Sequence, residues 1–142
     1  GNRVTRNQIM AIKEESVTEQ KNSLAVCLDN ILRHAGITRN TEYDLAQGKT
    51  ATTILSENMT GVQVLDLSGC TLDAVLYYVN QDIPVLAILE DGEAVLVTGF
   101  NEFNVVIMEP ATGKLYKKGM NDATAWFAEN GNHFITYMRT EN

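Results

Sequence analysis

The sequence predicts an α+β domain in which helices precede an antiparallel sheet. Apolar residues between positions 22 and 80 recur at helical spacing, whereas beyond position 84 they form short runs separated by turns. The length of 142 residues suits one hydrophobic core. Helices and strands that are segregated along the chain are typical of an α+β rather than an α/β architecture.

The strongest helical pattern spans residues 22–35. Its apolar positions recur at i, i+3, i+4, i+7, i+8 and i+11, and they are Leu24, Cys27, Leu28, Ile31, Leu32 and Ala35. This spacing makes one wide apolar stripe on a helix. Gly36 follows, where a helix end favours a left-handed residue. We therefore expect a buried central helix here.

The other expected helices are shorter. They span residues 41–46, 50–57, 71–80 with Thr71 as N-cap, and 121–128. Residues 5–16 are a further helix candidate, and Ser16 with Glu19 has the spacing of a capping box that opens the next element. Trp126 and Phe127 of the last helix are expected in the core, with a peptide-binding surface as the alternative.

The second half of the chain predicts an antiparallel meander. Residues 85–89 form a continuous apolar run, as in a strand buried on both faces, and Asp91-Gly92 is a hairpin signal. The further expected strands are 94–100, 103–108, 115–117 and 134–137, and a short extended stretch is expected within 61–67.

Composition excludes several classes of protein. The net charge of −7 leaves no surplus of cations to meet the phosphates of a nucleic acid. No apolar run approaches the roughly 20 residues of a membrane span. Two cysteines cannot form a disulfide framework. The chain begins with Gly rather than Met, so we expect a domain cut from a longer protein.

Four segments together resemble the papain-like, bacteriocin-processing (double-glycine) cysteine peptidases. Residues 22–36 resemble the helix that the catalytic cysteine opens, and 76–87 resemble the second helix entering the first strand. Residues 91–100 resemble the strand that begins with the catalytic histidine, and 105–113 the strand and turn that carry the catalytic aspartate. The resemblance spans roughly 20–137. It implies a papain-like fold and a bacterial protein, with residues 1–15 as an N-terminal extension and 16–142 as one peptidase-like domain.

The resemblance places different residues at each catalytic position. Ser23 occupies the position of the nucleophile, Glu93 that of the histidine and Glu109 that of the aspartate. The oxyanion glutamine would fall on Val17 or Thr18, and Gln20 is nearby but out of register.

These replacements predict loss of peptidase activity. A papain-like site needs a thiolate and an imidazole that holds its proton near neutral pH. A serine hydroxyl needs a base, and a glutamate with a reference pKa of about 4.3 is a poor one. The resemblance then implies a groove between the central helix and the meander that binds a peptide or protein partner, with Ser23, Glu93 and Glu109 lining its former catalytic end. Two carboxylates there favour a cationic or polar ligand.

Two alternatives remain open at this point. One is an active cysteine peptidase with a displaced nucleophile, either Cys70 beside the Thr71 cap or Cys27, although Cys27 lies on the apolar stripe and is expected in the core. The other is a structural or regulatory module that packs against other domains of a longer parent chain. The compartment stays open between bacterial cytoplasm and cell envelope.

No metal or cofactor is expected. His34 and His133 have no cysteine or histidine neighbour at metal-ligand spacing. Residues 111–114 look like the end of a phosphate loop but lack its upstream glycine, and they are expected to form a turn. Lys114, Lys117 and Lys118 make a small basic patch that predicts a solvated face.

Overall fold

The computed structural model describes residues 22–140. The expectations for residues 5–16 and for Ser16 with Glu19 lie outside these residues. In chain order the elements are α1 (Ser23–His34), α2 (Glu42–Ala46), α3 (Ala51–Asn58), β2 (Val62–Asp66), α4 (Leu72–Val79), β3 (Val85–Ile88), β4 (Ala94–Phe100), β5 (Asn104–Glu109), β6 (Lys114–Gly119), α5 (Met120–Glu129) and β7 (His133–Arg139).

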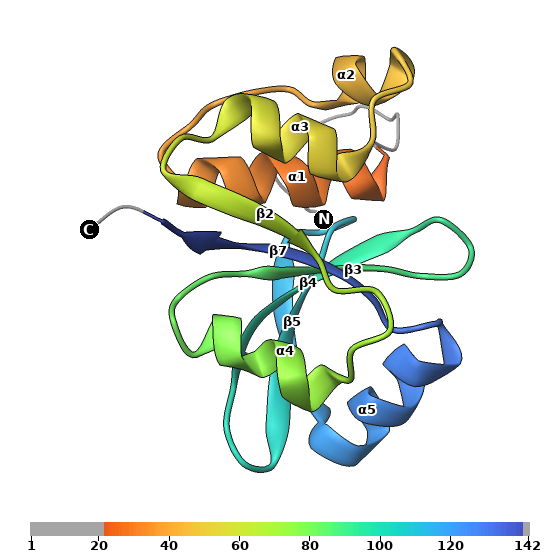
Figure 1. The fold of residues 1–142 in the computed structure, drawn as a ribbon. Helices are drawn as coiled ribbons and strands as arrows, with labels where there is room; N and C mark the ends of the chain where they lie inside the picture. The colour runs from red at the N-terminus through yellow and green to blue at the C-terminus, as the bar shows by residue number, and fades with distance from the viewer. Residues whose placement is uncertain (1–21, 141–142) are drawn as a thin grey trace, which may run out of the picture.

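One six-stranded antiparallel sheet separates two layers of helices. The strand order is β2-β7-β3-β4-β5-β6, so β3 to β6 form the predicted meander and β7 returns between β2 and β3. Helices α1 and α3 cover one face, and α4 and α5 cover the other, as Figure 1 shows. Between residues 22 and 140, no helix is long and apolar enough to cross a membrane.

Helix α1 forms where the apolar stripe predicts it. The Asn22 side chain caps its start by accepting a hydrogen bond of 2.8 Å from the Leu24 N–H. Gly36 follows its end with a φ of 88°, which glycine adopts without strain. The stripe is buried against the sheet and α3, because Cys27, Leu28 and Ile31 all lie in the core on this face.

Strand β4 is apolar throughout its first half because both of its faces are covered. Ala94 and Leu96 point into the core under α1, while Val95 and Val97 point into the core under α4 and α5. Strand β3 likewise places Leu86 in the core under α1 and Val85 and Ala87 in the other core, which confirms the strand buried on both faces that residues 85–89 predict.

Three details differ from the sequence expectation. Strand β6 is longer than residues 115–117, because Lys114 and Lys118 flank those residues on the edge strand and give no apolar signal. Strand β5 begins at Asn104 rather than Phe103, because the Asn101 side chain accepts a hydrogen bond from the Phe103 N–H and holds that residue in the turn. Phe127 is 1% exposed as expected, but Trp126 only reaches the edge of the core.

Replacing Leu28 tests the packing of α1. The side chain is fully buried, so we expect Leu28→Ala to lower the free energy of unfolding by about 2–5 kcal/mol in urea titrations. The matched control is Leu115→Ala on β6, where the side chain is 62% exposed and the loss should stay below about 1 kcal/mol. Equal losses in the two variants would contradict the central place of α1.

Candidate functional site

Ser23 joins the start of α1 to the start of β4. It is the first residue of the helix and is half-buried. Its Oγ accepts a hydrogen bond of 2.9 Å from the backbone N–H of Ala94, a residue 71 positions away. This contact fixes the N-terminus of α1 beside the turn between β3 and β4.

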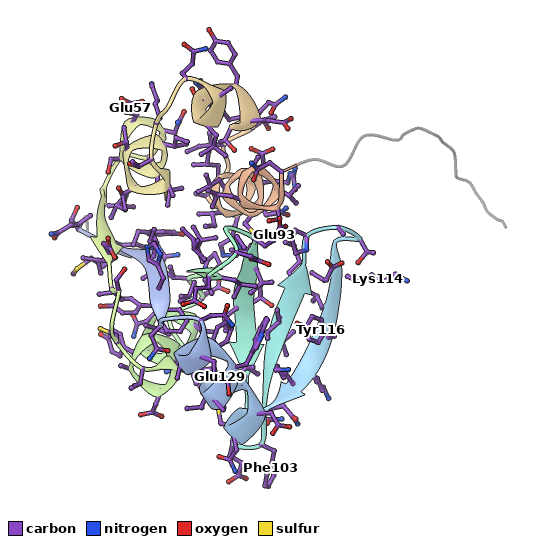
Figure 2. All side chains as sticks on the ribbon, turned by 90° about the vertical axis from the view of Figure 1, so that its right-hand side faces the viewer. Glu57, Glu93, Phe103, Lys114, Tyr116 and Glu129 are labelled. Carbon is purple, nitrogen blue, oxygen red and sulfur yellow. The ribbon has the colours of Figure 1, made fainter. Side chains whose placement is uncertain are left out.

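Glu93 lies next to this contact, at the end of that turn. Its N–H donates to Asp91 Oδ1 at 2.9 Å, and its carbonyl accepts from the Leu89 N–H at 2.7 Å. The backbone of Glu93 therefore closes the hairpin, while its side chain is exposed. Figure 2 shows it where the hairpin meets α1. Because successive residues of a strand point to opposite faces, the residue aimed under α1 is Ala94 and not Glu93.

Glu109 ends β5 at the same end of the sheet, where it pairs with Lys114 of β6. Leu96 of β4 pairs with Met108 of β5, so the start of β4 and the end of β5 adjoin. The Glu109 carboxylate accepts hydrogen bonds from the N–H and the hydroxyl of Thr112, at 3.1 and 3.0 Å. The structure thus brings Ser23, Glu93 and Glu109 to one end of the sheet, with Glu109 bonded into the turn between β5 and β6.

Cys27 lies one helical turn after Ser23 and is fully buried. Burial, together with the smaller effect of the negative charge of Glu109, raises the pKa of its thiol to about 12. The pKa of the Tyr116 hydroxyl is also raised, mainly by burial and to a smaller extent by the Glu109 carboxylate. Cys27 is therefore a core thiol, as its place on the apolar stripe predicts.

A cavity of about 350 Å³ lies beside the second half of α1. Asn30 and His34 border it from the helix, Leu96 and Met108 from the sheet, and Leu115 from β6. Ser23, Cys27, Asn30 and His34 are spaced i, i+4, i+7 and i+11, which places them along one side of α1. At 1.5 Å of rise per residue, Asn30 is about 10 Å along the helix from Ser23.

Asp82 is a residue of this cavity that sequence reasoning missed. The His34 Nε2 lies 3.0 Å from the Asp82 carbonyl oxygen and 3.6 Å from its carboxylate, and both residues border the cavity. Asp82 has a φ of 66° and lies in the turn before β3. Nothing local in the sequence predicts a contact across 48 positions.

The remaining candidates lie elsewhere. Cys70 comes just before the Thr71 cap of α4 and packs against the core on the opposite face of the sheet. His133 begins β7. Within residues 22–140, no group of three His, Cys, Asp or Glu side chains could hold a metal ion. Val17, Thr18 and Gln20 lie outside the described residues.

The fold, but not the sequence, resembles that of a known protein. No family model matches the chain, and no curated protein matches it. Among solved structures it is similar to a protein described as a putative C39-like peptidase from Bacillus anthracis, with a TM-score of 0.71 and 14% sequence identity over 88% of this chain and 92% of that one. The predicted α+β, papain-like peptidase fold, with its N-terminal helix packed on an antiparallel sheet, is confirmed.

The two cysteines should differ sharply toward a thiol reagent. With a pKa of about 12, only about one Cys27 thiol in ten thousand is ionised at pH 8, and the side chain is buried. We expect Ellman's reagent to modify Cys70 readily and Cys27 only after unfolding, as read by intact mass. Cys27→Ala and Cys70→Ala assign the two sites. Rapid modification of Cys27 in the folded protein would contradict its place in the core.

Proposed function

We propose that this domain keeps a peptidase-like fold without peptidase activity and binds a peptide or protein segment in the groove beside α1. The observation that carries the proposal is the partner of Ser23. The Ser23 hydroxyl oxygen accepts a hydrogen bond from the N–H of Ala94. A serine nucleophile instead needs a neighbouring base that takes the proton of its hydroxyl. An oxygen that accepts a hydrogen bond from an amide is less available to attack a carbonyl carbon.

The neighbouring carboxylates of Glu93 and Glu109 do not supply the base that Ser23 would need. Glu93 is exposed at the hairpin and Glu109 is bonded to Thr112. A solvated carboxylate is too weak a base to take the proton of a serine hydroxyl near neutral pH. The set of Ser23, Glu93 and Glu109 therefore supports recognition better than acyl transfer.

A displaced cysteine nucleophile is less well supported. Cys27 is buried, and the pKa of its thiol is about 12. Cys70 lies against the other core, across the sheet from Ser23. A nucleophilic cysteine has to be accessible as a thiolate, which burial prevents for Cys27, and Cys70 lies on the face of the sheet opposite α1 and the cavity.

The groove has the make-up of a binding site. The cavity of about 350 Å³ has apolar walls from Leu96, Met108 and Leu115, and polar groups of Asn30 and Asp82 at its border. Such a mixture is typical of sites that bury part of a ligand and orient it by a few polar contacts. Toward the start of α1, Glu93 and Glu109 add negative charge, which favours a cationic segment.

A serine-directed probe tests the loss of activity. We expect a fluorophosphonate to modify Ser23 no faster in the folded than in the urea-unfolded protein, because no base activates the hydroxyl. Intact mass spectrometry measures the modification. Fast stoichiometric labelling that Ser23→Ala abolishes would show a working nucleophile and overturn the assignment.

A charge reversal tests the acidic end of the groove. We expect Glu93→Lys to weaken binding of a fluorescein-labelled, lysine-rich peptide by about threefold to tenfold in low salt, measured by anisotropy. The control is Glu129→Lys, an equal charge change at an exposed residue of α5 that Figure 2 labels, and it should leave the affinity within about twofold. Equal weakening by both variants would show that net charge alone causes the effect and would contradict a role of Glu93 in binding.

A further inference from the structure

Strand β6 presents an open edge of the sheet. Within residues 22–140 it pairs with β5 alone and stands last in the strand order. Figure 2 shows no other described strand or helix beyond it. An edge strand exposes a row of N–H and C=O groups that can pair with another extended chain. The backbone of β6 is therefore available for a further strand.

The side chains of β6 combine positive charge with exposed apolar surface. Lys114, Lys117 and Lys118 lie on this one strand, although the protein carries a net charge of −7. The Lys118 ammonium lies 4.9 Å from the centre of the Trp126 ring and is held there. Between the lysines, Leu115 is 62% exposed and Tyr116 is 38% exposed.

The register of β6 fixes where these side chains point. Leu115 pairs with Met108, so both lie on the α1 side of the sheet, where they border the cavity. Lys117 shares this face with Leu115, whereas Lys114 and Tyr116 lie on the other face. A strand added to β6 would set its own side chains beside these four in the same order, with one of them next to Leu115 at the mouth of the cavity.

We propose that β6 binds an extended acidic segment of a partner protein by strand addition. The segment carries the order acidic, apolar, apolar, acidic, opposite Lys114, Leu115, Tyr116 and Lys117. Backbone hydrogen bonds supply the attachment and the two charge pairs set the register. The order reads alike in both directions, so it suits a parallel or an antiparallel strand. This surface lies outside the acidic end of the groove and goes beyond the function proposed above.

Two other readings of the edge fit less well. Pairing of β6 with β6 of a second copy would set lysines close to lysines, and like charges on adjacent strands destabilise a sheet. In the second reading, the lysines on this edge strand have no binding role and only protect the protein against aggregation. Protection of that kind does not account for Leu115 and Tyr116, because exposed apolar side chains on an edge favour pairing.

The test uses three fluorescein-labelled peptides of about ten residues. The first carries Glu-Val-Val-Glu in a threonine background. The second has the same composition rearranged to Val-Glu-Val-Glu, so that its glutamates no longer match the spacing of Lys114 and Lys117. The third has proline in place of both valines, which removes backbone donors. We expect the first to bind about tenfold more tightly than the other two, with slowed amide hydrogen exchange along β6.

Paired variants of the protein complete the test. The double change Lys114→Glu with Lys117→Glu should weaken binding of the first peptide by about tenfold, whereas Arg33→Glu with Lys49→Glu, the same change in net charge, should leave it within about twofold. Glu93→Lys should not weaken it either, which separates this surface from the groove. Equal affinity for all three peptides, equal loss in both double variants, protection confined to residues outside β6, or no binding at all would overturn the proposal.

Discussion

The packing of α1 across the centre of the sheet is the constraint on which the rest of the structure depends. The stripe of Leu28, Ile31 and Leu32 fills one core together with Leu96 and residues of β3 and β7. Two polar contacts set where the helix begins, the Asn22 cap and the bond from the Ala94 N–H to Ser23. Once α1 is placed, the position of Ser23 and the inner wall of the cavity follow.

Much of the fold could be predicted because its centre is strongly patterned. The stripe of α1 and the runs of β3 and β4 exist because these elements bury apolar residues, and burial leaves its period in the sequence. Edges leave less of a pattern, which explains the short prediction for β6. The place of β7 between β2 and β3 could not be predicted either, because the pairing of Val62 with Arg139, 77 positions apart, depends on whole-sheet topology and has no local signal.

The site could be predicted only in part, and for a different reason. Cys27 in the core follows from helical spacing, whereas Ser23, Glu93 and Glu109 were singled out through resemblance to a family motif. Neither helical spacing nor the family motif shows that Ala94, and not Glu93, points under α1. Strand alternation assigns these residues to a face only once the position of β4 against α1 is known. The contact of His34 with Asp82 and the cavity between them likewise arise from segments that the fold brings together.

Opposite charges meet where β5 turns into β6. Glu109 pairs with Lys114 across the two strands, so the acidic end of the groove adjoins the basic edge directly. The net charge of −7 repels an acidic segment at long range, and the lysines of β6 act mainly within a Debye length of about 8 Å. Charge alone would therefore bind such a segment weakly. Backbone pairing along the edge has to supply the attachment, and the lysines then select, among extended segments, those whose acidic residues fall in register.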